Sequence, residues 1–351
     1  MMGTINNTLL HSVSLLIEES RKVLVRNVNT TMVFTYFHVG RMIVEEEQQG
    51  SQRAAYAESI ISELSTHLTR EYGKGFSKRN LEYFRQFYLL YRSKIAQSLI
   101  AQSKQSAEPS SIAQSLSAFS EVFRLSWTHY IHLMKIEDSE ERKFYEIEAI
   151  SNNWSVRELQ RQFSSSLFER LVLSKNKASI KDLSSVGNVL EKPFDALKTP
   201  FVLEFLNLKE SESYSESDLE TAIINKLEHF MMELGKGFLF EGRQRRITLV
   251  GDHFYIDLVF YNRLLKCFVL IDLKIGKLSH QDLGQMQMYV NYYDRKIKLP
   301  DEKNTIGIVL CKEENKAVVE FTLPLNNEQI FAKEYKLYLP SKEDLRKQLE
   351  V

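Results

Sequence analysis

Residues 254–274, FYIDLVFYNRLLKCFVLIDLK, constrain the fold more than any other part of the chain. Two runs rich in Val, Ile, Phe and Tyr are separated by a polar turn at Asn262 and Arg263. Runs of this length and composition are typical of neighbouring buried strands, and the short turn between them predicts a hairpin.

The predicted hairpin carries Asp257 in its first strand and Asp272 and Lys274 in its second. Burying a charge in a strand is costly unless the charge is paired or binds a metal ion. Because side chains alternate across a strand, Asp272 and Lys274 share a face, and a hairpin can bring Asp257 onto it. Two carboxylates and an ammonium at the edge of an apolar sheet suit a Mg²⁺ site with a lysine beside the bound water.

The same three residues have a purely structural alternative. In that interpretation a buried Asp–Lys pair only stabilises the sheet. The flanking sequence is needed to choose between the two.

The composition excludes several broad classes of protein. The chain has 351 residues, enough for two domains, and its 46 Lys and Arg equal its 46 Asp and Glu, so any nucleic-acid-binding surface must be local. Cys267 and Cys311 lie in apolar contexts without metal-ligand spacing and are expected to be reduced. No run of about 18 apolar residues predicts a membrane span, and the polar N-terminus does not fit a signal peptide. We therefore expect a cytoplasmic protein.

The first half of the chain has apolar residues at helical spacing. The pattern predicts helices over residues 9–28, 30–48, 53–72 and 80–91. Gly73 and Gly75 allow a turn after the third helix, and Ser77 is a candidate N-cap for the fourth. A helix, a glycine turn and a Ser-capped helix together outline a helix-turn-helix unit.

The last of these helices is basic, with Lys78, Arg79 and Arg85 among its aromatic residues. Such a helix can contact phosphates of a nucleic acid. The alternative is an ordinary amphipathic helix with a solvated basic side, and the pattern by itself favours that alternative.

Two further stretches divide the chain. Residues 94–120 are rich in Ser, Ala and Gln and contain IAQSL twice, which indicates an inserted flexible excursion or an imperfect helix pair. Pro193 and Pro200 disfavour helix at the residues before them and indicate a linker over 176–200. We therefore predict an all-helical domain over 1–175 and a second domain over 201–351.

The second domain has the pattern of an α/β fold. A long helix is predicted over 215–234, and a second helix over 281–293. The predicted strands cover residues 238–241, 245–250, 255–261, 266–273, 305–311 and 335–339, with a further apolar run over 317–323.

This order of elements resembles the PD-(D/E)xK nuclease fold, which is restriction-endonuclease-like. Asp257 stands where the first motif aspartate stands, although no Pro precedes it. Asp272-Leu273-Lys274 matches the (D/E)xK motif, with Asp where relatives more often have Glu. In the following helix, Gln285 and Tyr289 match a QxxxY signature.

The resemblance extends over residues 10–345 to the YhcG-like nuclease family. It rests on shared segments in both halves of the chain: GRMIVEEEQQG, YGKGFSKRNLEYFRQFY, LSWTHY, WSVREL, PFVLEFL, FEGRQRRI, FYIDLVFYN and IGIVLC. It implies an α+β protein of two domains, a helical N-terminal domain of DNA-binding type with helix-turn-helix-like units and a C-terminal PD-(D/E)xK nuclease domain.

The resemblance also implies a catalytic site. Asp257, Asp272 and the Leu273 carbonyl would hold Mg²⁺, or Mn²⁺ in its place, together with Glu220 from the first helix of the domain. Glu216 and Glu233 are alternatives to Glu220. Lys274 would orient the attacking water.

Further residues would bind the substrate. Gln285 and Tyr289 would position the DNA backbone. Arg243, Arg245 and Arg246 are candidates for phosphate contacts, with solvated strand ends as the alternative.

The implied function is metal-dependent hydrolysis of DNA phosphodiester bonds, endo- or exonucleolytic, in DNA processing, recombination and repair, or defence against foreign DNA. The implied partners are DNA and a second copy of the chain in a homodimer, without a membrane or a small-molecule cofactor. Two alternatives stay open: a catalytically silent DNA-binding or assembly protein that retains the fold, and a toxin or defence effector that acts only with partners.

The basic helix generates a first prediction. Segment 1–175 should bind DNA weakly, with an affinity that falls steeply as salt rises, because phosphate contacts release counterions. Reversing the charges of Lys78, Arg79 and Arg85 should remove most of that binding in a fluorescence anisotropy titration. Unchanged binding by the triple variant would leave the helix-turn-helix interpretation without support.

Overall fold

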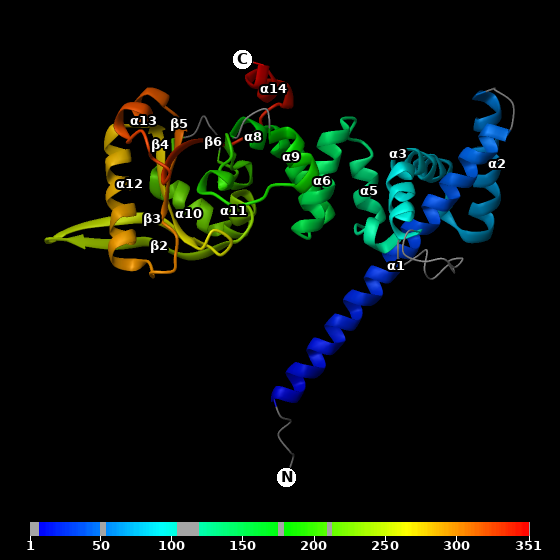
Figure 1. The fold of residues 1–351 in the computed structure, drawn as a ribbon, viewed down its shortest axis with the longest axis horizontal. Helices are drawn as coiled ribbons and strands as arrows, with labels where there is room; N and C mark the ends of the chain where they lie inside the picture. The colour runs from blue at the N-terminus through cyan, green and yellow to red at the C-terminus, as the bar shows by residue number, and fades with distance from the viewer. Residues whose placement is uncertain (1–6, 50–53, 104–118, 175–178, 209–212, 351) are drawn as a thin grey trace, which may run out of the picture. The chain divides into compact units, whose positions relative to one another are not determined.

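The computed structural model describes residues 7–49, 54–103, 119–174, 179–208 and 213–350 (Figure 1). The chain divides into two compact units, residues 1–142 and 143–351, and each is described by itself. Within the described ranges, no helix has both the length and the apolar character needed to cross a bilayer.

The first unit is helical. Its elements are α1 (Asn7–Gln49), α2 (Ala54–Tyr72), the 3₁₀ turn η1 (Lys74–Phe76), α3 (Lys78–Ser103), α5 (Trp127–Leu133) and the start of α6 (Ser139–Ser151). Residues 30–48 do not form a separate helix, because α1 runs unbroken through the predicted boundary. No Gly or Pro lies at the predicted boundary, residues 28–30, and the hydroxyls of Thr31 and Thr35 bond back to carbonyls four residues earlier.

Helices α1 and α3 cross at very close range. A Cβ on Gly40 of α1 would lie 2.0 Å from the carbonyl oxygen of Phe84 in α3, so only glycine fits there. Next to this crossing, the Tyr36 and Phe84 rings stack with centroids 4.1 Å apart. The aromatic residues of the basic helix therefore form a packed core, as its amphipathic pattern requires.

The basic side of α3 is partly engaged within the first unit. Lys78 and Arg79 are exposed, and Arg79 donates to the Tyr83 hydroxyl. Arg85 forms an ion pair with Glu47 of α1 at 2.7 Å. Reversing the charge of Arg85 therefore also breaks a contact inside the unit, and a Glu47→Gln variant is the control for that effect.

The predicted Ser-rich stretch is only partly described. Helix α3 continues to Ser103, so the first IAQSL copy is helical. The second copy, at 112–116, lies outside the described residues.

The second unit combines helices with a mixed sheet. Its helices are the rest of α6, α7 (Val156–Ser164), α8 (Leu167–Ser174), α9 (Ser179–Val186), α10 (Glu216–Asn225), α11 (Leu227–Leu234), α12 (His280–Tyr292), α13 (Lys316–Thr322) and α14 (Lys342–Glu350). Two short 3₁₀ turns, η2 (Pro193–Ala196) and η3 (Glu204–Leu206), and a π-helical turn, η4 (Tyr293–Ile297), complete the set of labelled helices.

The sheet has six strands in the order β1-β6-β5-β4-β3-β2. They are β1 (Phe201–Val202), β2 (Phe238–Leu249), β3 (Asp252–Asn262), β4 (Cys267–Lys277), β5 (Ile306–Glu313) and β6 (Ile330–Lys336). Strands β2, β3 and β4 are antiparallel neighbours, whereas β4, β5, β6 and β1 run parallel. This arrangement confirms the α+β fold class predicted from the sequence.

Several predicted boundaries were wrong, among them that of the last strand, which was predicted over 335–339 and runs over Ile330–Lys336. Residues 238–241 and 245–250 belong to one strand, β2, which passes through a bulge between Phe240 and Gly242. The long helix predicted over 215–234 is broken at Lys226, whose ψ of 31° is not helical, so that α10 and α11 are separate. The periodic apolar pattern continues across this break, and it therefore could not reveal the change of direction.

The sheet is covered on both faces (Figure 1). Leu219 and Phe230, from α10 and α11, join Leu258 and Ile271 of the sheet in one apolar cluster. On the other face, Leu283 and other α12 residues pack against β3, β4 and β5 in a second cluster. Charged residues that lie between these layers must therefore be paired or functional.

The division between the units falls at Arg142, earlier than the predicted linker over 176–200. One reason is an ionic cluster that ties α8 to α11. Glu233 is fully buried and lies 2.5 Å from Arg170, itself fully buried, and it also accepts the Val202 backbone N–H. Arg161 of α7 lies 3.4 Å from the same carboxylate. The boundary between the domains at 175–200 stays a prediction.

Glu233 generates a prediction about stability. Burial alone would raise its pKa, but the charges of Arg170, Lys198 and Arg161 outweigh burial and lower the pKa to about 2. Glu233→Gln leaves Arg170 buried without a counter-charge and should cost about 3–5 kcal/mol of unfolding free energy in urea. Glu228→Gln, at an exposed position of the same helix, should change it little.

The same ion pair predicts a pH dependence. A carboxyl group whose pKa is lowered by folding stabilises the protein above its unfolded pKa and loses that contribution as the pH falls toward the folded value. The difference in stability between the parent protein and Glu233→Gln should therefore shrink as the pH falls from about 4.5 to about 2. A difference that does not vary over this range would show that the pKa of Glu233 is not lowered.

Candidate active site

The candidate site lies where two strands of the hairpin separate. Strands β3 and β4 pair from Asn262↔Cys267 to Leu258↔Ile271, and the ladder stops there. Continuing the register by one step would set Asp257 opposite Asp272. The two acidic residues predicted from the sequence thus face each other at the fork of the hairpin.

At the fork, the Asp257 side chain takes the place of the next backbone acceptor of the ladder. Its Oδ2 accepts the Leu273 backbone N–H at 2.8 Å, in place of a strand carbonyl. This bond satisfies a backbone donor that the end of the β3–β4 ladder would otherwise leave unpaired. It also fixes the position of the Asp257 carboxylate beside the backbone between Asp272 and Lys274.

Asp272 and Lys274 form an ion pair within β4. Asp272 is 2% exposed, and its Oδ2 lies 2.9 Å from Lys274 Nζ. This oxygen forms no hydrogen bond among the described residues, so its contact with Lys274 is ionic only. Glu216, at the start of α10, lies 3.4 Å from the same ammonium.

The pKa values of both residues are raised, which favours the neutral form of Asp272 and the charged form of Lys274. Burial, and then the charge of Asp257, raise the pKa of Asp272 to about 7. Burial alone would lower the pKa of Lys274, but Asp272, Glu216 and Asp257 outweigh it and raise that pKa. The site thus keeps its ammonium charged and holds one carboxyl group whose charge is costly without a further cation.

Glu220 joins the site from α10 through an intermediary. The side-chain amide of Gln244 on β2 donates to Glu220 Oε2 at 2.6 Å and to Asp257 Oδ1 at 3.0 Å. Burial is the main cause that raises the pKa of Glu220. Glu220, Asp257, Asp272 and Lys274 are called the fork cluster below.

Gln244 is not among the residues predicted from the sequence. This residue lies between two arginines in the segment EGRQRRI, where its polarity alone is unremarkable. The useful signal is the strand register, since Arg243↔Leu258 and Arg245↔Ile256 place Gln244 opposite Asp257. Its φ of 48° interrupts the regular strand at that point.

The QxxxY pair lies on α12, directly behind β3. Tyr289 is fully buried, and its hydroxyl donates to the Tyr255 carbonyl oxygen at 2.8 Å. Gln285 donates to the same hydroxyl. Both residues therefore hold β3 two positions before Asp257.

The three candidate arginines lie on β2 and are exposed. Arg245 forms an ion pair with Glu241 on the same strand, whose carboxylate therefore competes with a phosphate for it. The charge of Arg243 opposes the rise in the pKa of Glu220 but does not outweigh burial.

The structure separates the three candidate helix carboxylates. Glu220 reaches Asp257 through Gln244, and Glu216 reaches Lys274. Glu233 instead belongs to the buried cluster with Arg170. This placement favours Glu220 as the acidic residue of the first helix.

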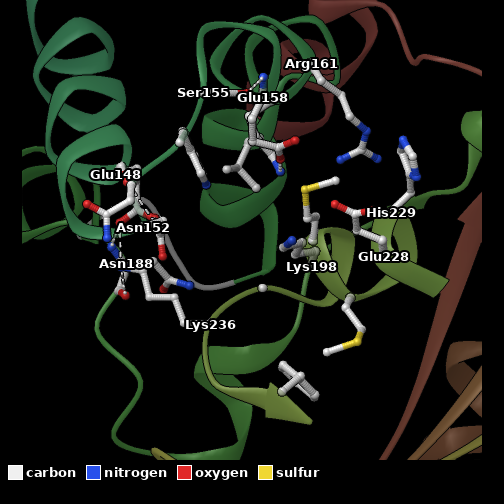
Figure 2. A pocket seen from close by; sticks show the side chains of 18 of the residues that line it. Glu148, Asn152, Ser155, Glu158, Arg161, Asn188, Lys198, Glu228, His229 and Lys236 are labelled. Carbon is white, nitrogen blue, oxygen red and sulfur yellow. Dashed lines mark hydrogen bonds and ion pairs between the residues drawn. The ribbon is translucent and has the colours of Figure 1, made fainter. Parts of the chain in front are cut away.

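A cavity of about 1100 Å³ lies elsewhere in the second unit, between α6–α8 and α11 (Figure 2). The fork cluster does not line it. On its wall, Lys236 pairs with Glu148 at 2.9 Å, and burial lowers the pKa of Lys198 to about 8. Arg161 Nη1 and Gln162 Oε1 on this wall lack a hydrogen bond among the described residues. The wall carries none of the residues of the D…DxK motif, however, so we place the candidate active site at the fork of the hairpin.

The residues at the fork fit a divalent metal ion chemically. Carboxylate oxygens are the ligands that Mg²⁺ prefers, and Asp272 has a buried oxygen without a hydrogen bond. In the described ranges, no three acidic, His or Cys side chains converge closely enough to enclose an ion. The Gln244 amide, which bonds to two of the carboxylates, is one group that would have to move when an ion binds.

Comparison with known proteins covers nearly the whole chain. Residues 194–350 match the model of the YhcG PDDEXK nuclease domain, and residues 12–170 match the DUF1016 N-terminal domain. A relative from Escherichia coli (strain K12), "Putative nuclease YhcG", is 41% identical over 344 residues. The alignment covers 95% of this chain and 91% of the relative.

Solved structures with a similar part are more distant. A repair endonuclease from Pyrococcus abyssi is 20% identical over 37% of this chain and 50% of its own, with a TM-score of 0.26. EndoMS in a complex with double-stranded DNA is 14% identical over 38% of this chain and 51% of its own, also with a TM-score of 0.26. The chain thus spans about half the length of these structures.

Tyr289 generates a prediction about the support of the site. Tyr289→Phe removes the buried hydroxyl and leaves the Tyr255 carbonyl without its donor, which should cost about 1–3 kcal/mol of unfolding free energy. Chemical denaturation followed by circular dichroism measures this loss. Tyr292→Phe, at a half-buried position of the same helix, should cost less, and equal losses would argue against the bond.

Proposed function

Because this chain belongs to the YhcG family and carries its PDDEXK nuclease domain, we propose that it is a metal-dependent deoxyribonuclease that hydrolyses phosphodiester bonds of DNA. The observation that carries the proposal is the fork of the hairpin. There Asp257, Asp272 and Lys274 lie together, and Gln244 links Glu220 to Asp257.

The carboxylates and the lysine have separate tasks in this proposal. Asp257, Asp272 and Glu220 would hold Mg²⁺, or Mn²⁺ in its place, together with the Leu273 carbonyl. A bound divalent ion lowers the pKa of a water ligand and stabilises charge on the phosphate. Lys274 stays protonated, so its ammonium can orient the attacking water and offset negative charge that develops on the phosphate.

Other residues would position the substrate. Tyr289 is fully buried and cannot touch the DNA backbone itself, so with Gln285 it would act indirectly, by fixing the strand that carries Asp257. Arg243 and Arg246 are exposed beside it and would contact phosphates, with Arg245 available when it leaves Glu241. In the helical unit, exposed Lys78 and Arg79 would add contacts to the DNA backbone. Such an activity would serve DNA processing, recombination and repair, or defence against foreign DNA.

The decisive experiment is a cleavage assay on single-stranded, duplex and branched DNA with Mg²⁺, with Mn²⁺ and with chelator. Asp272→Asn and Lys274→Ala should each lower the rate by at least about 100-fold, as loss of one group that stabilises transition-state charge does. Lys277→Ala, at an exposed position of the same strand, should keep the parent rate.

Melting curves with and without Mg²⁺ separate this proposal from a purely structural ion pair. Variants that fold and bind DNA but do not cleave support catalysis, whereas unfolding of both would favour the structural role. A protein that binds DNA equally with and without metal and never cleaves would be the catalytically silent alternative. Glu220→Ala should be inactive, and an active Glu220→Ala beside an inactive, folded Glu233→Ala would reverse that assignment.

A further inference from the structure

Strands β2 and β3 form a two-stranded arm beyond the fork of the hairpin (Figure 1). Their pairing continues from Phe238↔Asn262 to Leu249↔Asp252, whereas β4 accompanies β3 only as far as Leu258. Within the part of the chain that the structure describes, residues 245–256, called the arm below, thus have no third strand beside β3.

One face of the arm is covered. Ile247 and Ile256 are buried in the cluster that contains Leu283 of α12, and Leu249 and Phe254 pack against it. These residues alternate along the two strands, so their neighbours must point to the opposite side.

The opposite face of the arm is open to solvent. The register pairs Arg246 with Tyr255 and Thr248 with His253, and all four residues are exposed. Thr248 Oγ1 lies 3.0 Å from His253 Nδ1, and Tyr255 is 47% exposed. Because residues paired across strands lie on one face, these side chains form a continuous surface, the outer face of the arm.

This outer face is suited to a nucleic acid strand. It offers a basic side chain and an aromatic ring side by side, with hydroxyl and imidazole groups next to them. Arg246 is the arginine of this face, because Arg245 is paired with Ile256 on the covered face and forms an ion pair with Glu241. Aromatic rings that stack on bases, with cations for the phosphates, are the usual means of binding single strands.

The outer face also leads to the active site. Tyr255 precedes Asp257 by two residues, about 7 Å along a strand. The Tyr289 hydroxyl anchors the Tyr255 carbonyl, so the backbone of this tyrosine is fixed relative to Asp257.

We propose that the outer face of the arm binds an unpaired DNA strand next to the scissile phosphate, with Tyr255 stacking on a base and Arg246 contacting a phosphate. The inference rests on the proposed function and narrows it to DNA that has a single-stranded segment beside the cut. A duplex is a poorer fit, because a β-ribbon reads a duplex by entering a groove, and α12 covers the other face of this ribbon.

The test measures binding without cleavage. The full chain with Asp272→Asn is titrated in chelator with a fluorescent single-stranded oligonucleotide and with the matching duplex. Adding Tyr255→Ala should weaken single-strand binding at least about fivefold, the loss expected for one stacked base. Adding Tyr255→Phe should restore it, and duplex binding should change less than twofold.

A tyrosine of equal exposure provides the matched control. Tyr338 is 46% exposed and follows β6, away from the arm in the sequence, so Tyr338→Ala should leave binding unchanged. Equal effects of the Ala variants at 255 and 338, or equal losses on single strand and duplex, would overturn the assignment of the arm. Absence of single-strand binding by the parent would also overturn it, while the separate cleavage assay still decides the nuclease proposal.

Discussion

The hydrogen bond from the Leu273 backbone N–H to Asp257 is the interaction on which the site depends. An antiparallel ladder that continued past Leu258 and Ile271 would pair its backbone groups and leave no opening between the strands. The carboxylate takes the place of a strand carbonyl, so β3 and β4 can separate without leaving a buried donor unpaired. The Asp257 carboxylate thus both lets the strands separate and forms part of the acidic lining of the opening. The arm exists for the same reason, because β3 leaves β4 at this point and continues with β2 alone.

The layers on the two faces of the sheet explain how this opening stays in place. Helix α12 supplies Tyr289, whose hydroxyl holds the Tyr255 carbonyl from one side. Helix α10 presents Glu220 to Gln244, and α11 is tied to α8 through the pairing of Glu233 with Arg170. The charged residues of the second unit thus fall into two groups with different roles. Glu233 is fully buried and paired, which gives it a stabilising role, whereas Asp272 is buried with an oxygen that lacks a hydrogen bond.

The polar side chains near the fork become more exposed with distance from it. Asp272 is buried, Asp257 is half-buried beside Gln244, and Arg246, Tyr255 and His253 are exposed. A DNA strand that approached from solvent would meet the charged and aromatic side chains first and the carboxylates last. Burial and then the charge of Asp257 raise the pKa of Asp272, and the surrounding carboxylates keep Lys274 protonated. An incoming divalent cation would offset the negative charge of these carboxylates.

The sequence by itself determined the hairpin, the positions of Asp257, Asp272 and Lys274, and the family. Strand periodicity and the cost of buried charge act over a few residues, and they are visible in the segment 254–274. Only the tertiary structure decided which helix carboxylate approaches the site, because Glu216, Glu220 and Glu233 lie in one apolar pattern that breaks at Lys226. It also revealed Gln244, whose role comes from its register opposite Asp257, and the single helix α1, in which nothing local stops the helix at residue 30. These features depend on pairing between distant segments, and local composition carries no record of such pairing.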